Sequence, residues 1–298
     1  MKNFRGKTAF ITGGASGIGL ALAEECCAQG MSVVIADIRQ NVLDEAAKTL
    51  KDWPVMAIAL DVTDREAYQT AVDDAEARFG NIHLLVNNAG IGCARGPLWE
   101  VSYAQTDLAI NINLTAALNG IRILAPRMLQ SGQECYIVST ASKAALIAVP
   151  NCGLYNITKQ ALIAMTESLV SDFQGTNVGA SVFLPGPFES DLGQSSGEIE
   201  SIQLGTEANP PPQRDVDRSA WGKQLRPASE AAKRILRGVE RGDIYIVTHS
   251  EFKAGFKERT DAMLRAFPDE KPKEGFDEVF GFLVSNPIFN TQKDVPAL

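Results

Sequence analysis

Short runs of apolar residues alternate along the chain with longer segments in which apolar residues recur at helical spacing. An apolar run of about four to eight residues bounded by turn residues is typical of a strand buried on both faces. The longer segments are typical of helices that pack one face on a sheet. The predicted strands cover residues 8–12, 32–36, 55–60, 82–86, 135–139, 177–184 and 244–247. The predicted helices cover residues 20–29, 42–51, 65–79, 103–129, 154–172 and 229–240.

The regular alternation of strand and helix determines the predicted fold class. Strands separated by helices of this length form βαβ units, which require a parallel sheet. Right-handed crossovers and short connections favour an α/β fold with a doubly wound parallel sheet, the Rossmann fold. We therefore predict one catalytic domain over residues 1–250 and a C-terminal extension over residues 251–298.

The regular pattern stops after the sixth predicted strand. A long segment without secondary structure inside a domain is usually a lid or a binding loop. We predict irregular structure over residues 185–226 and a substrate lid over residues 187–226. The five prolines of this segment are Pro185, Pro187, Pro210, Pro211 and Pro212.

The C-terminal extension is rich in phenylalanine, and so many apolar side chains require burial against the body or a second subunit. Phe252, Phe256 and Leu264 lie close to one helical stripe, and Phe267 lies a further turn on. Two interpretations of this stripe are open. It packs on the last strand, or it closes with the lid over the substrate as an apolar wall.

Composition excludes several classes of protein. The chain has 298 residues, of which 45% are hydrophobic and 21% charged, the balance of a soluble globular protein rather than a disordered one. The formal net charge is −8, so binding to nucleic acid or to an anionic membrane is not expected. No uninterrupted apolar run approaches the roughly 20 residues of a membrane-spanning helix. The N-terminal residues do not form a signal peptide.

The cysteines indicate a reducing compartment. There are five, an odd number, and no two of them have the Cys-x-x-Cys spacing. A disulfide framework or a zinc site is therefore not expected, and no metal is predicted. We expect a cytoplasmic protein.

A glycine-rich turn joins the first predicted strand to the first predicted helix. Glycine permits the tight turn and lets the backbone approach a pyrophosphate, while the helix N-terminus offers unpaired N–H groups to the phosphates. This position predicts a dinucleotide site. Its predicted residues are Gly13, Ser16, Gly17, Ile18 and Gly19.

An acidic residue ends the second predicted strand. Asp37 can accept hydrogen bonds from both hydroxyls of an adenosine ribose and would repel a 2′-phosphate. Arg39 lies nearby and offers the alternative, a cation that could hold that phosphate. Because no basic residue lies in the glycine turn, we predict NAD rather than NADP as the cofactor.

Four short motifs follow one another along the chain: the Thr12–Gly19 turn, Asn87-Asn88-Ala89-Gly90, Tyr155-x-x-x-Lys159 and Pro185-Gly186. Their order and spacing resemble the short-chain dehydrogenase/reductase family over about residues 5–247. The resemblance implies further cofactor contacts after the third, fourth and sixth strands, with the last group covering the nicotinamide. These residues are Asp61, Val62, Asn88, Ala89, Gly90, Pro185, Gly186, Phe188 and Ser190.

The catalytic chemistry centres on Tyr155 and Lys159, which lie four residues apart on one face of a predicted helix. Interconverting an alcohol and a carbonyl requires a side chain that moves the hydroxyl proton while the nicotinamide takes the hydride. A phenol has an ordinary pKa of about 10, and a neighbouring ammonium favours the phenolate. We therefore expect Lys159 to lower the pKa of Tyr155. Both residues are also expected to contact the cofactor.

The resemblance also implies two supporting residues. Ser142 has the family's spacing from Tyr155 for the serine that binds the substrate oxygen, and Ser139 is the nearby alternative. Asn113 resembles the helix asparagine that anchors a water in a proton relay with Lys159, and Asn111 is the alternative. We favour Ser142 and Asn113.

These observations predict an NAD-dependent oxidoreductase that interconverts a secondary alcohol and a ketone. The extension loosely resembles that of a subgroup acting on bulky aryl alcohols, so we expect a bulky or aromatic substrate. One alternative is a non-catalytic NAD-sensing or scaffold protein of the same fold. Another is a racemase or dehydratase that uses the same cofactor.

Other features complete the predictions. The long predicted helices at 103–129 and 154–172 resemble the family's subunit-packing pair, which implies a homodimer or homotetramer. His249 lies near the lid and is considered as a possible substrate contact. Cys152 is interpreted as a small lining residue rather than a nucleophile.

Overall fold

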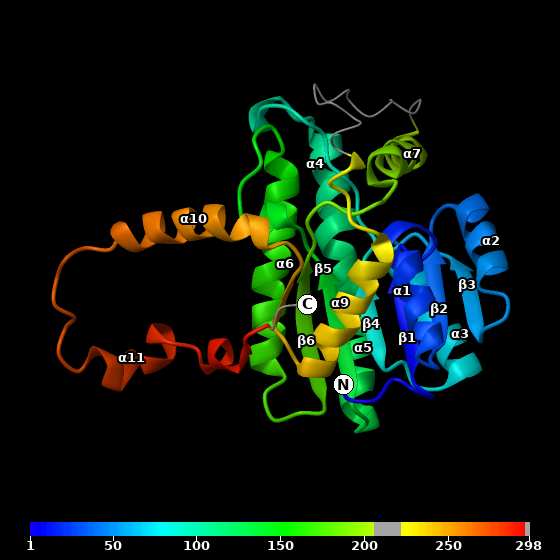
Figure 1. Cartoon of the computed structure of the whole chain (residues 1–298), viewed down its shortest axis with the longest axis horizontal. Coiled ribbons are helices and arrows are strands. Elements are labelled where there is room, and N and C mark those ends of the chain that lie inside the picture. The colour runs from blue at the N-terminus through cyan, green and yellow to red at the C-terminus, as the bar shows by residue number, and fades with distance from the viewer. Residues whose placement is uncertain (206–221, 296–298) are drawn as a thin grey trace.

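A seven-stranded parallel sheet forms the centre of the molecule, with the strand order β3-β2-β1-β4-β5-β6-β7 (Figure 1). The structure, a computed structural model, describes residues 1–205 and 222–295. The predicted doubly wound fold is confirmed. The strands are β1 (Thr8–Thr12), β2 (Ser32–Asp37), β3 (Val55–Ala59), β4 (Leu84–Asn87), β5 (Cys135–Thr140), β6 (Val178–Leu184) and β7 (Tyr245–Val247).

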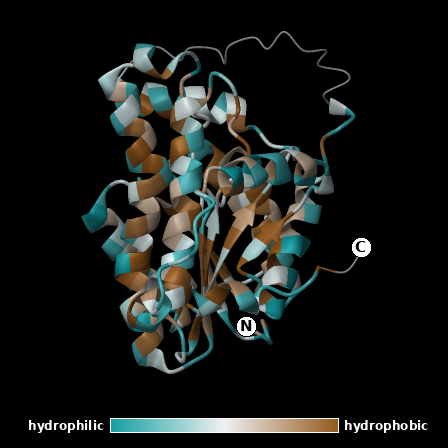
Figure 2. Ribbon diagram, turned by 90° about the vertical axis from the view of Figure 1, so that its left-hand side faces the viewer, coloured by the Kyte–Doolittle hydropathy of each residue, from teal (hydrophilic) through white to brown (hydrophobic). Residues whose placement is uncertain are grey.

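Helices cover both faces of the sheet, and hydrophobic residues concentrate on the strands between them (Figure 2). One layer consists of α1 (Gly17–Ala28), α2 (Gln40–Thr49) and α9 (Ala228–Arg241). The other layer consists of α3 (Arg65–Phe79), α4 (Tyr103–Ile110), α5 (Ala116–Ser131) and α6 (Gly153–Asp172).

The two layers explain why the strands are continuous apolar runs. In β2, Val33 and Ile35 pack in the core beneath α1 and α9, whereas Val34 packs in the core on the α3 side. Successive side chains of a strand point to opposite faces, so a strand covered on both sides requires apolar residues at every position. Full burial of one such side chain stabilises the fold by roughly 1.5–3 kcal/mol.

The long helix predicted over residues 103–129 is continuous but not uniform. A π-helical turn, η2 (Asn111–Thr115), separates α4 from α5. Such π turns occur often at functional sites. The span Tyr103–Ser131 is long and apolar enough to cross a membrane, but 61% of its most apolar window is buried inside the fold, where it serves as a core helix.

The segment after β6 differs from the prediction. Residues Leu192–Leu204 form a helix, α7, where the prolines led us to predict irregular structure. The stretch between Pro187 and Pro210 holds no proline, and Gly205 ends the helix in the left-handed conformation. The part of the predicted lid at 206–221 lies outside the described residues.

The C-terminal extension leaves the body after β7 and returns to it. After η4 (Ser250–Phe252), α10 (Lys253–Arg265) projects beyond α6 in Figure 1, and α11 (Phe276–Val284) follows. The short helix η5 (Pro287–Thr291) then packs on the body, where Ile288 is buried. Gln292 Oε1 accepts a hydrogen bond from the N–H of Tyr245 at 2.9 Å.

The phenylalanine stripe of the extension does not pack on the last strand within this chain. Phe256 is 38% exposed, Leu264 62% and Phe267 74%. The segment that follows η5, and not α10, lies beside β7. The backbone N–H of Tyr245 in this edge strand donates to Gln292 of that segment. The first of the two interpretations of the stripe is therefore wrong for the described chain.

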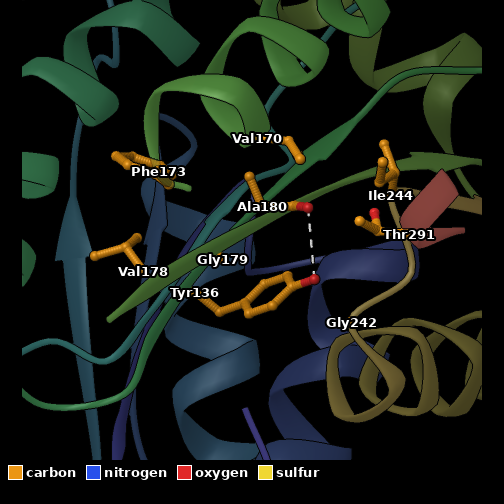
Figure 3. A pocket seen from close by; sticks show the side chains of 9 residues that line it. All are labelled: Tyr136, Val170, Phe173, Val178, Gly179, Ala180, Gly242, Ile244 and Thr291. Carbon is orange, nitrogen blue, oxygen red and sulfur yellow. Dashed lines mark hydrogen bonds between the residues drawn. The ribbon is translucent and has the colours of Figure 1, made fainter. Parts of the chain in front are cut away.

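A small cavity of about 150 Å³ lies between the sheet and the return of the extension (Figure 3). Its lining includes Tyr136 and Val178, near the amino ends of β5 and β6, together with Thr291 of η5. The Tyr136 hydroxyl lies 3.4 Å from the carbonyl oxygen of Ala180 and 2.9 Å from Ser181 Oγ. The cavity is thus at the opposite end of these strands from the predicted catalytic residues.

Candidate active site

The glycine turn between β1 and α1 forms a backbone cradle that only glycine fits. Gly13 has a φ of +60°, and a Cβ there would lie 3.0 Å from Ala89 Cα. A Cβ on Gly19 would lie 2.0 Å from the carbonyl oxygen of Gly13. Ser16 occupies the N-cap position of α1, and its side chain makes no capping bond. The N–H groups of the first turn of α1 can therefore bind a phosphate.

Asn88 connects the loop after β4 to this turn. Its Nδ2 donates to the carbonyl oxygens of Thr12 and Gly13, each at 3.1 Å. The backbone N–H groups of Asn88 and Ala89 donate to Thr12 Oγ1 at 3.0 and 3.1 Å. The two predicted cofactor loops are thus held as one unit. Thr12 is a residue that we did not predict, although its hydroxyl at the end of β1 holds both loops.

The acidic residues expected at the adenosine lie at the carboxyl ends of β2 and β3. Asp37 is buried and accepts from Arg39 Nε at 3.2 Å, while Arg39 Nη2 donates to Ser16 Oγ at 3.0 Å. Asp61 Oδ2 accepts from Gln203 Nε2 of α7 at 2.7 Å. The Arg39 pairing and the contact from α7 are both absent from the predictions.

Val62 and the segment after β6 hold further residues that were predicted to contact the cofactor. Val62 is buried, and its carbonyl oxygen accepts from Asn119 Nδ2 at 3.2 Å. After β6, the carbonyl oxygen of Pro185 accepts from the N–H of Lys143 at 2.9 Å. Ser190 lies beside the glycine turn, since a Cβ added to Gly17 would lie 3.3 Å from the Cβ of Ser190.

Gly186 is closely packed against β7 and the segment that follows it. Its N–H donates to Thr248 Oγ1 at 3.1 Å, and a Cβ there would lie 2.5 Å from His249 Nδ1. Phe188 packs edge-on against His249, with ring centroids 5.2 Å apart. His249 is therefore a buried residue that packs against this loop and supports it.

The predicted catalytic residues meet at the carboxyl end of β5. Ser142 lies just beyond the strand, close enough to Tyr155 to lower the pKa of its phenol. Lys159 is buried on the same face of α6, donates from Nζ to the carbonyl oxygen of Thr140 at 2.9 Å, and lies 5.7 Å from the centroid of the Tyr155 ring. Ser139 lies within β5, 3.5 Å from Asn87 Nδ2. Of the two serines, Ser142 is the one beside Tyr155.

Asn113 is held by the π turn in the interior of the site. It is 2% exposed, whereas Asn111 is exposed. Its Oδ1 accepts from the N–H of Ile91 at 2.8 Å, and its Nδ2 donates to Ile91 O at 3.0 Å and to Thr158 Oγ1 at 3.2 Å. Asn113 thus fixes the loop after β4. A water-anchoring role for it stays a prediction.

The geometry combines a dinucleotide cradle with a serine, a tyrosine and a lysine at one edge of a parallel sheet. A family model described as short chain dehydrogenase matches residues 7–201. The chain belongs to the short-chain dehydrogenase family. The match ends within α7, so the extension lies outside it.

Members of the short-chain dehydrogenase family resemble this chain over nearly its whole length. The C alpha-dehydrogenase of Sphingobium sp. strain SYK-6 is 32% identical over 281 residues, which cover 92% of this chain and 91% of that protein. A short chain dehydrogenase/reductase from Burkholderia phymatum, solved in complex with NAD, is 30% identical, with a TM-score of 0.80 over 92% of this chain and 100% of that one. The apo form of LigO from Sphingobium sp. strain SYK-6 is 30% identical, with a TM-score of 0.76 over 100% of both chains.

Burial sets the ionisation of the short-chain dehydrogenase residues in this chain. It raises the pKa of Tyr155 to about 12, while the hydrogen bond from Ser142 acts in the opposite direction. Burial also lowers the pKa of Lys159 to about 8. Desolvation is the largest influence on the Tyr155 phenol in this structure, and the expected lowering of its pKa by Lys159 stays a prediction.

The remaining sequence predictions for this region concern Cys152 and a metal site. Cys152 is buried at the N-cap of α6, consistent with a lining residue. Within residues 1–205 and 222–295, no group of three or more histidine, cysteine, aspartate or glutamate side chains is placed to hold a metal ion.

Proposed function

We propose that this protein is an NAD-dependent dehydrogenase that interconverts a secondary alcohol and a ketone, with Tyr155 as the acid and base. The observation that carries the proposal is the contact of Tyr155 with Ser142, with the buried Lys159 on the same helix face. A phenol within hydrogen-bond reach of a serine hydroxyl can exchange a proton with a substrate oxygen bound between them.

The cofactor prediction, NAD, is confirmed by the family and by the related structure that contains NAD. The cradle fits this group, because a Cβ at Gly13 or Gly19 would fill the space beside the turn. We expect Asp37 to bind the ribose and the first turn of α1 to bind the pyrophosphate. When bound, NAD supplies the hydride acceptor.

The protein residues have distinct roles in this mechanism. Tyr155 moves the proton at its hydroxyl oxygen, and Ser142 orients the substrate oxygen by hydrogen bonding. Lys159 adds a positive charge behind the phenol, held by its bond to the carbonyl oxygen of Thr140. Asn113 positions the loop after β4 at Ile91. This part of the loop is close to the lysine, since a Cβ on Gly90 would lie 3.1 Å from Asn113 Oδ1 and 3.2 Å from Lys159 Nζ.

The substrate proposed is bulky or aromatic. Phe252 lies at the start of the extension, 5.7 Å from His249 and 5.4 Å from Lys143 Nζ, beside the Gly186 loop. A Cβ on Gly255 of α10 would lie 2.8 Å from Ile147 Cδ1, which brings the first turn of α10 to the loop after Ser142. The extension thereby adds apolar surface near the catalytic residues. The relationship to a C alpha-dehydrogenase also supports this substrate class.

The test is a panel of alcohols, from small aliphatic to bulky aromatic, with NADH formation followed by absorbance. We expect turnover of secondary alcohols, with the highest kcat/KM for the bulky aromatic ones. Tyr155→Phe keeps the ring and removes the ionisable group, so kcat should fall by about 10²-fold or more while the NADH Kd stays near its wild-type value.

Two results of this test would contradict the proposal. Near-normal turnover in Tyr155→Phe would exclude the tyrosine as acid and base. NAD binding without stoichiometric NADH formation from any alcohol would favour a scaffold protein, or a racemase or dehydratase that regenerates its cofactor.

A further inference from the structure

Arg39 lies two residues beyond Asp37, where the ribose of the cofactor is expected. Its side chain is only 8% exposed. A buried guanidinium requires partners, because an unpaired charge inside a protein is costly. A guanidinium with spare donors beside the ribose would bind the 2′-phosphate that distinguishes NADP from NAD. The partners of Arg39 therefore bear directly on cofactor choice.

The donors of Arg39 are taken by groups of the protein. Nε and Nη2 donate to the two carboxylate oxygens of Asp37 at 3.2 and 3.3 Å, and Nη2 also donates to Ser16 Oγ at 3.0 Å. The third nitrogen, Nη1, lies 3.6 Å from Glu198 Oε2 on α7. The other oxygen of Glu198 accepts from Gln194 Nε2 at 3.0 Å, which orients the carboxylate.

The position of Glu198 is fixed on both sides along α7. Before it, Ser196 Oγ accepts from the N–H of Gly92 at 2.8 Å. After it, Gln203 Nε2 donates to Asp61 Oδ2 at 2.7 Å. α7 therefore spans from the loop after β4 to the end of β3, and Glu198 faces the carboxyl end of β2 between these contacts.

We propose that Glu198 is a cofactor-specificity residue: with Asp37, it holds Arg39 in an ion pair within the protein, so that Arg39 does not serve a 2′-phosphate. The two carboxylates outweigh the one guanidinium, which leaves a negative charge beside the ribose. That charge repels a 2′-phosphate, whereas the hydroxyls of NAD are neutral. The inference rests on the cofactor assignment of the proposed function.

The experiment measures binding rather than turnover, with the full-length protein titrated with NADH and with NADPH by nicotinamide fluorescence. In Glu198→Gln, the amide keeps the shape of the side chain but removes its charge, so Nη1 of Arg39 is released. We expect the Kd for NADPH to fall by about fivefold to tenfold. This range is typical of the electrostatic interaction of one half-exposed charge with a phosphate. The Kd for NADH should change by less than about twofold, because NAD carries no group that uses Nη1.

Two matched variants separate the ion pair from a general loss of charge. Glu200→Gln makes the same change two residues along α7, where the carboxylate accepts from Gln105 Nε2 at 3.0 Å and does not pair with Arg39. Its Kd for NADPH should stay near the wild-type value. In the double variant Arg39→Leu with Glu198→Gln, the gain over Arg39→Leu alone should be at least twofold smaller than the gain in the Arg39 background, because only the repulsion by the Glu198 charge is then relieved. The single-variant gain should also shrink as salt is added, because Glu198 is 40% exposed.

Each other outcome overturns a defined statement. An unchanged NADPH Kd in Glu198→Gln, or wild-type protein that already prefers NADPH, contradicts the inference about Glu198. A gain of undiminished size in the Arg39→Leu background shows that Glu198 acts by its own charge alone and contradicts the ion-pair explanation. Wild-type protein that binds neither nucleotide contradicts the proposed function itself.

Discussion

The ionisation of Tyr155 determines how the rate of each direction of the proposed reaction depends on pH. Burial raises the pKa of its phenol to about 12, so the group is protonated near pH 7. A protonated phenol can donate to the oxygen of a ketone, whereas oxidation of an alcohol requires the phenolate as a base. At neutral pH, nearly all of the enzyme therefore has the protonated phenol that ketone reduction requires. Alcohol oxidation depends on the small fraction that has the phenolate.

This ionisation predicts different pH profiles for the two directions. Between pH 6 and 8, kcat/KM for alcohol oxidation should rise by about tenfold per unit, because the phenolate fraction rises by that factor below the pKa. Ketone reduction should stay nearly constant over the same range. The slope of the oxidation profile should decrease above pH 8, where Lys159, with its pKa lowered to about 8, loses its charge.

Initial rates with saturating NAD or NADH and a single alcohol and ketone pair would measure both profiles. A flat oxidation profile from pH 6 to 8 would mean that the phenol is already ionised, and that its environment in the working enzyme is not the buried one described.

Single residues also show what the sequence could and could not predict. The resemblance to the family, through its spacing from Tyr155, favoured Ser142 over Ser139, and the structure places only Ser142 beside Tyr155. The pKa of Tyr155 was not predictable in the same way, because it depends on how much of the phenol is desolvated by residues from other elements. The pairing of Arg39 was left open for the same reason, since one of its partners, Glu198, comes from a distant helix.

At the scale of elements, the junction of β1 and α1 combines a turn, a helix start and a close approach to the next loop. A Cβ on Gly19 would lie 2.0 Å from the carbonyl oxygen of Gly13 and 2.8 Å from Asn88 Nδ2. Asn88 Nδ2 donates to that same carbonyl oxygen. A side chain at this position must therefore displace the bond that joins the two cofactor loops.

We expect Gly19→Ala to weaken NADH binding by about tenfold or more, since the backbone N–H groups that face the pyrophosphate would shift. Gly281→Ala in α11 is the control, because its Cβ would meet no atom within 4 Å. Fluorescence titration gives the Kd, and circular dichroism shows that each variant is folded. A folded Gly19→Ala protein with wild-type NADH affinity would contradict the cradle as described.

Elements with a strong local signal were predictable, and elements with mixed signals were not. The helix over Arg65–Phe79 has the predicted bounds, with Asp64 capping its first turn through bonds from the N–H groups of Glu66 and Ala67. In contrast, α7 follows two prolines and was missed, although Gly205 marks its end. The π turn at Asn111–Thr115 has no signal in hydrophobic spacing, because its extra residue is accommodated by packing against α6.

At the scale of the whole molecule, two groups of exposed apolar side chains among the described residues bear on assembly. One is the projecting helix α10 with the bend that follows it, where Met263, Leu264 and Phe267 are more than half exposed. The other is the outer side of the α5 and α6 pair, where Leu118 is 40% exposed and Ile157 is 51% exposed. Apolar surface of this extent on a folded chain is typical of a subunit contact. No property of the local sequence distinguishes such positions from core positions, because both are apolar at helical spacing.

We predict a homodimer or homotetramer formed through α5 and α6. A symmetric contact uses the same patch on both subunits. A charge placed there therefore lies close to the same charge of the other subunit, and both charges lose their contact with water. Leu118→Glu combined with Ile157→Glu should therefore lower the mass measured by light scattering at micromolar concentration toward that of a single chain. Leu264→Glu on α10 introduces the same charge at a side chain that is 62% exposed, and it should leave the mass unchanged. Dissociation by Leu264→Glu alone would move the interface to the extension, and a monomeric wild-type protein would refute the assembly altogether.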